Sequence, residues 1–404
     1  MNRTLRFRPA ALVAAALMLA PCLGAVESKV WVEFENGKRL FRQKEFGQAL
    51  NAFRSAANER RRMFEDASRA LAAAVDSPQA RKSGGSILAL VDEFAKENFL
   101  ASELDQINTR AGSSLRKKID LLRQRRLTDR FRGYLDALYL TLEYRTFDEL
   151  GDSLPNLQNA AAALAMYPEA EFWIGRVFQA EGELRLAEIQ YSRAWDMREA
   201  YEISDERFTP LYALADLYRT RGDFLRMEEQ YLAVVRHDPT ASDPKNEYLR
   251  NAMLNTLTKD GFDKFMSLYR TEGDFAVRAY DALGTFWYES GRQGKAVLYL
   301  GLGVNRILTK AIDAVRSDEP TYAYNRLTEL MGRISARRDL EEFARNAELN
   351  RLLFTLADAL YANGSRGPAR DLWRTLSELP DSGIWGTRSA SQLRAPVVKV
   401  PALP

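Results

Sequence analysis

Cysteine and histidine are nearly absent from this chain of 404 residues, which has one of each, Cys22 and His237. Metal sites that need several Cys or His ligands, and redox pairs of thiols, cannot be assembled from that inventory. The phosphate-binding GxxxxGK motif is missing too. We therefore predict no metal, no cofactor and no catalytic residues. Composition alone leaves open an enzyme that uses carboxylates only, such as one that processes peptidoglycan, but no motif supports it.

Net charge is also small, because the 58 Lys and Arg residues are nearly balanced by 55 Asp and Glu residues. The excess of three comes from Arg3, Arg6 and Arg8, since the first 25 residues contain no acid. The rest of the chain is neutral, which argues against general nucleic-acid binding. Hydrophobic residues make up 46% and charged residues 28%, a balance typical of a folded soluble protein.

The first 25 residues have the layout of a secretory signal peptide. A basic segment, residues 1–8, precedes an apolar run over residues 10–20, and the small residues Gly24 and Ala25 follow. The apolar run is shorter than the roughly 20 residues that a membrane-spanning helix needs. We expect cleavage near Ala25 and a periplasmic protein.

An alternative is a lipid anchor at Cys22. The stretch Leu19-Ala20-Pro21-Cys22 resembles the box that precedes a lipid-modified cysteine. Pro21, however, stands where that box has a small residue. If Cys22 were retained and lipidated, the protein would be anchored at the envelope.

Helical periodicity dominates the rest of the chain, because apolar residues recur every three or four positions. Glycines separate successive amphipathic stretches, as expected where a helix ends in a left-handed residue. These turn glycines are Gly182, Gly222, Gly291 and Gly364.

Small and bulky residues flank the turn glycines at constant offsets. Seven positions before each glycine the residue is small: Gly175, Ala215, Gly284 and Ala357. Four positions before each glycine the residue is bulky: Phe178, Tyr218, Trp287 and Leu360. Five positions after three of the glycines stands an alanine: Ala187, Ala296 and Ala369, with Met227 as the exception. This alternation resembles the tetratricopeptide repeat, in which two antiparallel helices approach at small residues.

The resemblance implies an all-α fold, an α-solenoid of antiparallel helix pairs wound as a right-handed superhelix. Degenerate pairs at 247–269 and 321–350 are expected to fill the long gaps between turn glycines. The predicted parts follow in chain order: a signal peptide (1–25), an N-terminal repeat (26–58), an irregular helical segment (59–167, irregular at about 60–165), an array of about five to six pairs (168–380) and a Pro-containing tail (381–404).

Members of this family act as non-enzymatic scaffolds that bind partner proteins along the concave face, which the first helix of each pair lines. The positions that match this face are Trp31, Phe34, Lys38, Phe41, Phe172, Arg176, Gln179, Tyr212, Asp216, Arg219, Asp281, Thr285, Tyr288, Phe354, Asp358 and Tyr361. Rings beside Arg or Lys favour peptide binding. The competing interpretation is that several rings only pack against neighbouring helices.

A basic stretch between Arg110 and Arg132 is the second distinctive feature, with nine basic residues and two acids. The residues that would dock an anionic headgroup or an acidic partner are Arg116, Lys117, Lys118, Arg123, Arg125 and Arg126. The simpler interpretation is a solvated face of a helix whose apolar stripe is Leu115, Ile119 and Leu122.

The sequence thus predicts an exported scaffold or assembly factor that binds other proteins in the bacterial periplasm, with peripheral contact to an anionic membrane as an option and no nucleic acid or metal as partner. Exported tetratricopeptide proteins include parts of spirochaetal flagellar collars and of outer-membrane machines. A lipid-anchored assembly factor of such a machine is the main alternative.

Overall fold

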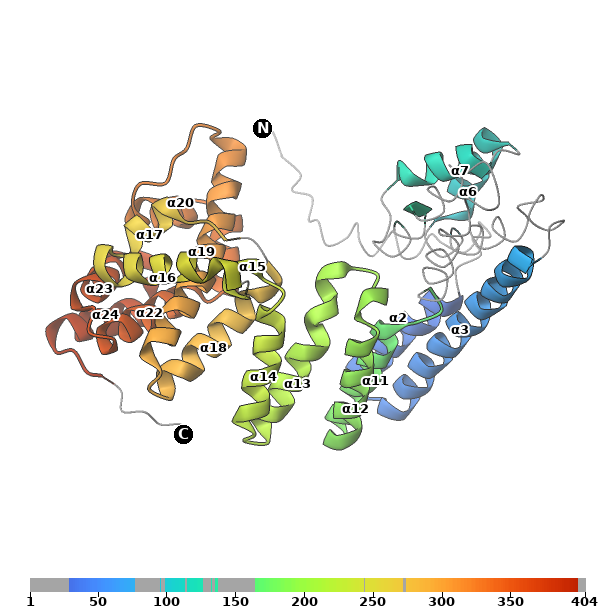
Figure 1. Ribbon diagram of the computed structural model, residues 1–404, viewed down its shortest axis with the longest axis horizontal. Helices are drawn as coiled ribbons and strands as arrows, with labels where there is room; N and C mark the ends of the chain where they lie inside the picture. The colour runs from blue at the N-terminus through green and yellow to red at the C-terminus, as the bar shows by residue number, and fades with distance from the viewer. Residues whose placement is uncertain are drawn as a thin grey trace, which may run out of the picture. The chain divides into compact units, whose positions relative to one another are not determined.

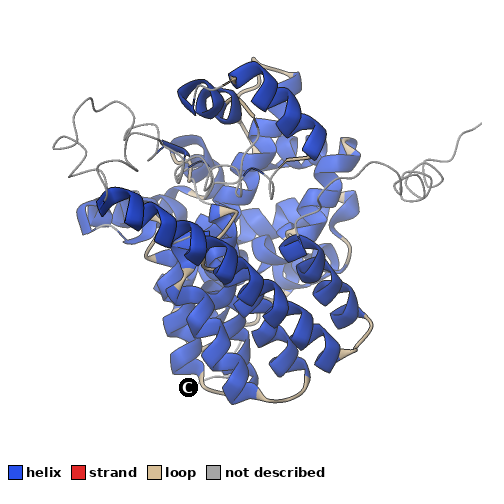
Figure 2. Cartoon of the chain, turned by 90° about the vertical axis from the view of Figure 1, so that its right-hand side faces the viewer, coloured by secondary structure: helices blue, strands red, loops and turns tan. Residues whose placement is uncertain are grey.

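The computed structural model describes residues 29–76, 95, 99–112, 115–125, 132, 135–136, 164–242, 244–271 and 274–398. In these ranges every regular element is helical, which confirms the all-α prediction (Figure 2). The chain divides into two compact units, Met1–Arg207 and Phe208–Pro404. The predicted signal peptide and Cys22 lie outside the described residues, as do Arg126 and residues 399–404.

The first unit contains two helix pairs and a shorter helical piece (Figure 1). Helices α2 (Lys29–Arg42) and α3 (Phe46–Asp76) pack against each other, and α11 (Pro168–Ala180) packs against both α3 and α12 (Leu184–Asp196). Helices α6 (Ala101–Ala111) and α7 (Leu115–Arg123) form the shorter piece. The core of the two pairs is rich in aromatic residues, with Phe53 and Tyr191 fully buried.

The second unit is built from further helix pairs (Figure 1). In chain order its α-helices are α13 (Thr209–Thr220), α14 (Phe224–Val235), α15 (Pro239–Ser242), α16 (Glu247–Asn255), α17 (Phe262–Leu268), α18 (Val277–Glu289), α19 (Gln293–Asp318), α20 (Leu327–Ala336), α21 (Arg338–Asn346), α22 (Leu349–Ala362), α23 (Arg366–Glu378) and α24 (Ile384–Arg394). A π-helical turn, Thr256–Asp260, joins α16 to the Gly261 turn before α17. Helices are therefore present in both stretches where degenerate pairs are expected, 247–269 and 321–350, although α20 begins at Leu327 rather than Thr321.

The turn glycines behave as the sequence predicts. Gly182, Gly222, Gly291 and Gly364 have φ between 74° and 88°. A side chain at a positive φ is strained, so glycine is favoured where each first helix ends.

The small residues of the first helices are also explained by the structure. A Cβ atom added at Gly284 would lie 2.5 Å from Cγ of Leu300 and 3.1 Å from its backbone nitrogen. Added Cβ atoms at Gly37 and Gly175 would similarly meet the rings of Phe53 and Tyr191 at 2.6 Å and 2.7 Å. Each glycine lets the second helix of its pair approach closely.

A substitution at Gly284 tests this close approach. Gly284→Ala is expected to destabilise the second unit by about 1–3 kcal/mol, because the backbone of α19 would have to move. Gly332→Ala, at an exposed site in α20 where an added Cβ meets nothing within 4 Å, is the matched control and should stabilise by up to about 1 kcal/mol. Urea denaturation of both variants measures the difference; equal stabilities would contradict the packing argument.

The predicted boundary at residue 58 is wrong, because α3 continues to Asp76 as one helix of 31 residues. No Gly or Pro interrupts the sequence between Gln48 and Ser77, so nothing ends the helix there. Within the segment predicted to be irregular and helical (59–167), the chain bends at Phe99 and α6 begins at Ala101. Most of residues 77–98 and 126–163 of this segment lie outside the described residues.

The predicted tail from residue 381 is wrong for its first half, because Ile384–Arg394 forms α24. This helix packs on α23 and α22. Trp385 contacts the ring of Phe354 with a centroid distance of 5.4 Å, and Ser389 is fully buried. Gly383, with φ 59°, allows the sharp entry into the helix. Small buried residues on one face of α24 make the close packing possible.

None of the helices in the described ranges combines the length and the apolar character that a membrane span requires.

Candidate functional site

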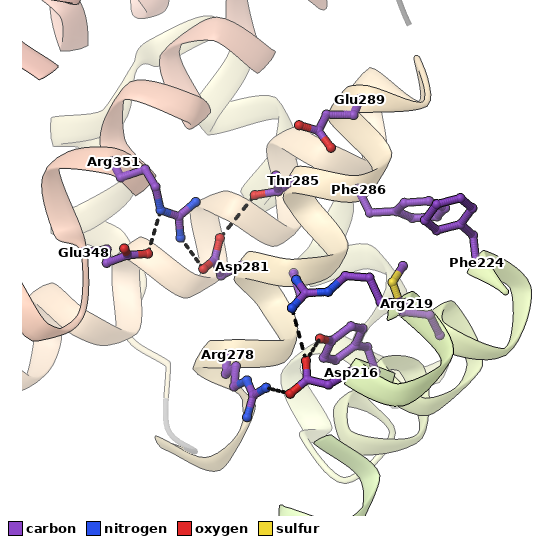
Figure 3. A pocket seen from close by; sticks show the side chains of 13 residues that line it. Asp216, Arg219, Phe224, Arg278, Asp281, Thr285, Phe286, Glu289, Glu348 and Arg351 are labelled. Carbon is purple, nitrogen blue, oxygen red and sulfur yellow. Dashed lines mark hydrogen bonds and ion pairs between the residues drawn. The ribbon is translucent and has the colours of Figure 1, made fainter. Parts of the chain in front are cut away.

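A cavity of about 450 Å³ in the second unit brings together residues from α13, α14, α18 and the start of α22 (Figure 3). The charged residues that line it are Asp216, Arg219, Arg278, Asp281, Glu289, Glu348 and Arg351. Its apolar and hydroxyl-bearing lining consists of Phe224, Met227, Tyr231, Ala282, Thr285 and Phe286. The cavity therefore combines ion pairs with an aromatic wall.

Asp216 is the centre of the first polar cluster. Its carboxylate accepts hydrogen bonds from Nη2 of Arg278 at 2.5 Å, from Nη2 of Arg219 at 3.5 Å and from the hydroxyl of Tyr231 at 3.4 Å. Partial burial opposes the charge of Arg278, but the bond to Asp216 outweighs it and raises the pKa of the guanidinium. Burial, and secondly the Asp216 charge, raises the pKa of the Tyr231 hydroxyl. Arg278 therefore stays charged and Tyr231 stays neutral at neutral pH.

Arg351 is the centre of the second polar cluster. Its guanidinium donates to Oδ2 of Asp281, and its Nε donates to Oε2 of Glu348 at 2.7 Å (Figure 3). Thr285 donates from Oγ1 to the other oxygen of Asp281 at 3.2 Å. Partial burial alone would lower the pKa of Arg351, whereas the two carboxylates raise it. Two acids thus share one cation on this side of the cavity.

The aromatic wall lies at the α14 and α18 side. The rings of Phe224 and Phe286 stack with centroids 5.9 Å apart, and Met227 is buried beside them. Glu289 lies one turn beyond Thr285 along α18 (Figure 3). Its carboxylate forms no hydrogen bond or ion pair with the residues that the structure describes.

A second cavity, of about 270 Å³, shares Glu348 and Arg351 with the first. Trp385, Asp381 and Asn350 also line it. Glu348 has a left-handed backbone with φ 50°, unusual for a residue other than glycine. The start of α22, where Glu348 has this uncommon backbone conformation, therefore separates the two cavities.

Four of the sequence-predicted binding residues line the larger cavity: Asp216, Arg219, Asp281 and Thr285. The remaining predicted residues of this unit do not. Tyr212, Tyr288, Phe354 and Asp358 are buried, and Tyr361 packs on Trp373. Asp358 accepts a hydrogen bond from Nε1 of Trp373 at 3.1 Å. The rings of Tyr212, Tyr288 and Phe354 thus lie in the core, as the competing interpretation expects, and Asp358 is buried as a hydrogen-bond acceptor.

The predicted binding residues of the first unit, apart from Trp31, lie in or beside an aromatic cluster. Phe34 and Phe172 are buried, whereas Trp31 is 56% exposed. Lys38 pairs with Glu35 at 2.8 Å and lies 4.5 Å from the centroid of the Phe34 ring.

The other three residues of this set lie in the same cluster. Phe41 contacts the Trp173 ring, and Arg176 lies 5.9 Å from the Phe41 centroid. Gln179 accepts from the hydroxyl of Tyr191 at 2.6 Å. The structure thus brings these residues together mainly as a packed interface between α2, α3 and α11.

The basic helix α7 differs in one respect from its prediction. Ile119 and Leu122 are fully buried, as expected, but Lys118 is buried as well. Lys118 precedes Leu122 by one helical turn, so its aliphatic stem lies on the apolar face. Arg116, Lys117 and Arg125 are exposed, and Arg123 pairs with Asp136 at 2.9 Å.

A buried carboxyl group, Glu169, lies at the start of α11 in the first unit. Its side chain accepts a hydrogen bond from the backbone N–H of Glu202 at 2.6 Å. Its second oxygen and the hydroxyl of Tyr201 are buried and form no hydrogen bond with the described residues. Burial raises the pKa of Glu169 from an ordinary 4.5 to about 7, against the opposing charges of Arg60 and Lys38. The sequence contained no signal for this group.

Sequence reasoning missed the other nine residues that line the larger cavity: Phe224, Met227, Tyr231, Arg278, Ala282, Phe286, Glu289, Glu348 and Arg351. Two of them were recognisable, because Arg278 and Glu289 share a helical face with Asp281, Ala282 and Thr285. Glu348 and Arg351 come from a helix 60 to 70 positions further along the chain, and no local pattern shows that they approach α18.

Comparison with known proteins gives no function. No protein-family model matches the chain. A protein of Treponema pallidum, described only as uncharacterized, is 29% identical over 262 residues, which are 64% of this chain and 69% of that protein. A second uncharacterized protein, from Borreliella burgdorferi, is 20% identical over 263 residues, 59% of this chain and 81% of that protein.

Proposed function

We propose that the protein is a tetratricopeptide-like, non-enzymatic scaffold that binds a partner polypeptide in the larger cavity of the second unit. The observation that carries this proposal is the convergence of Asp216, Arg219, Asp281 and Thr285 on one cavity, since all four were assigned from repeat positions alone. First-helix positions of two pairs, α13 with α14 and α18 with α19, thus contribute to one groove. The surrounding ion pairs and the Phe224–Phe286 wall supply the mixture of polar and aromatic contacts that binding surfaces use.

The α-solenoid arrangement is part of the same proposal. Positive φ at the turn glycines and close helix approach at Gly37, Gly175 and Gly284 support it, because these are the features that the repeat requires. A repeat scaffold needs no catalytic group, and the cavity residues engage one another in ion pairs rather than forming a nucleophile and base.

We propose the periplasm as its location, on the layout of residues 1–25. An envelope assembly, such as a flagellar or outer-membrane machine, is the setting in which we propose that the scaffold acts. The N-terminus of the mature protein, measured by mass spectrometry, tests export: a start near Val26 supports it, and a lipidated Cys22 would support the anchored alternative.

Filling the groove tests the binding role. Ala282 is half-buried and lines the cavity, so Ala282→Trp is expected to reduce capture of the partner by at least about tenfold without changing helical circular dichroism. Glu229→Trp, at an exposed position of α14 outside the cavity, is the matched control. The tagged variants would be purified from the native envelope and the amounts of co-purified proteins compared. Unchanged capture by Ala282→Trp would reject the groove as the binding site.

A further inference from the structure

The larger cavity of the second unit, which is the groove of the proposed function, contains more carboxylates than cations. Four acids, Asp216, Asp281, Glu289 and Glu348, line it together with three arginines. Coulomb attraction in such a partly enclosed space favours an occupant that balances the spare negative charge. A partner therefore has to bring positive charge that complements this excess of negative charge.

The arginines of the groove are already engaged. Arg219 and Arg278 both bind Asp216, and Arg351 binds Asp281 and Glu348. A carboxylate on the partner would have to displace one of these intramolecular acids, so it would gain little. The groove therefore offers poor sites for an acidic segment.

Glu289 is the carboxylate that remains available. The nearest cation along the chain, Arg292, binds Glu228 through Nη1, at 3.0 Å to each carboxylate oxygen. Glu289 itself is half-buried, which strengthens its interaction with an incoming cation relative to a fully solvated acid. The stacked rings of Phe224 and Phe286 line the same cavity and can cover the aliphatic stem of a Lys or Arg side chain.

Building on the proposed function, we infer that the groove selects a basic polypeptide segment. Its Lys or Arg cation lies against Glu289, and an adjacent apolar side chain or the stem of the same residue lies against the Phe224–Phe286 pair. An acidic segment is excluded by the same charges. The specificity thus resides in Glu289, which has no ion-pair partner among the described residues, and in the aromatic wall of the same cavity.

Selection of random 12-residue peptides displayed on phage tests the inference on the full chain. Peptides that bind the wild type but not Ala282→Trp are sequenced. The peptide that binds most tightly is synthesised, together with a counterpart in which Glu replaces each Lys or Arg. We expect groove-dependent peptides to be enriched in Lys and Arg. Fluorescence anisotropy should show affinity about tenfold lower for Glu289→Gln, an effect that added salt reduces. Glu229→Gln, an exposed acid of α14, should bind like the wild type.

The outcomes separate the two proposals. If groove-dependent peptides are acidic or neutral, or if Glu289→Gln binds the basic peptide as tightly as the wild type does, the charge selection is wrong while the binding groove stands. If no peptide distinguishes the wild type from Ala282→Trp, both proposals are wrong.

Discussion

The stability of the wild type relative to Glu169→Gln is expected to fall by about 3 kcal/mol between pH 4.5 and pH 8.5. Burial raises the pKa of Glu169 from 4.5 to about 7, and each unit of difference is worth about 1.4 kcal/mol. Below pH 4.5 the carboxyl is protonated in both folded and unfolded chains. As the pH rises from 4.5 to 7, only the folded state keeps the proton, so stability decreases; above 7 the loss is complete.

The Glu169→Gln variant makes the comparison specific. Its side-chain amide would keep an oxygen that can accept the hydrogen bond from Glu202 N–H, but it cannot ionise. Urea denaturation of both proteins over a pH series gives the difference, and hydrogen exchange of α11 amides locates it in the first unit. Glu206, whose pKa is raised first by burial and then by Glu169, is present in both proteins, so only the part that Glu169 causes enters the difference. A pH-independent difference would show that Glu169 is solvated.

Removal of residues 381–404 is expected to destabilise the second unit by about 3–5 kcal/mol, comparable to the loss of a large buried side chain. Deleting α24 would uncover the Phe354 ring that Trp385 contacts. It would also remove Gln392, which donates to Asp358 at 3.3 Å, and a buried acceptor that loses a donor adds a desolvation cost.

A shorter truncation, which removes residues 396–404 and leaves α24 intact, is the control for this deletion. It is expected to change stability by less than about 0.5 kcal/mol, because Val397 is 66% exposed. Thermal unfolding of both truncated chains compares the two. If the longer truncation were equally harmless, residues 381–394 would behave as the tail that the sequence suggested.

The sequence predicted features that are local along the chain. Turn glycines at Gly182 and Gly222, and close approach at Gly284, could be recognised because each is set by spacing within one helix pair. Spacing within one pair could not predict the π-helical turn at Thr256–Asp260 or the start of α20 at Leu327. Asp263 of α17 accepts hydrogen bonds from the N–H of Leu327 and the hydroxyl of Tyr324, so a residue from another pair stabilises the start of α20.

The candidate site, too, could be predicted only as far as local patterns in the sequence determine it. Periodicity placed Asp216 and Asp281 on the correct helical faces, but it could not tell an accessible ring from a buried one. Tyr212 and Tyr288 occupy equally suitable positions but lie in the core. Which first-helix residues stay open depends on how successive pairs stack, and that is a non-local property.

The wall between the two cavities has a thermodynamic consequence. Arg351 and Glu348 face both spaces, so a ligand that draws Glu348 away from Arg351 in one cavity changes the charges presented to the other. Binding in the two cavities would then be cooperative. Linkage requires that each ligand change the affinity for the other by the same factor. Titrating one peptide in the presence and absence of a second measures this coupling, and identical affinities would show that the compartments act independently.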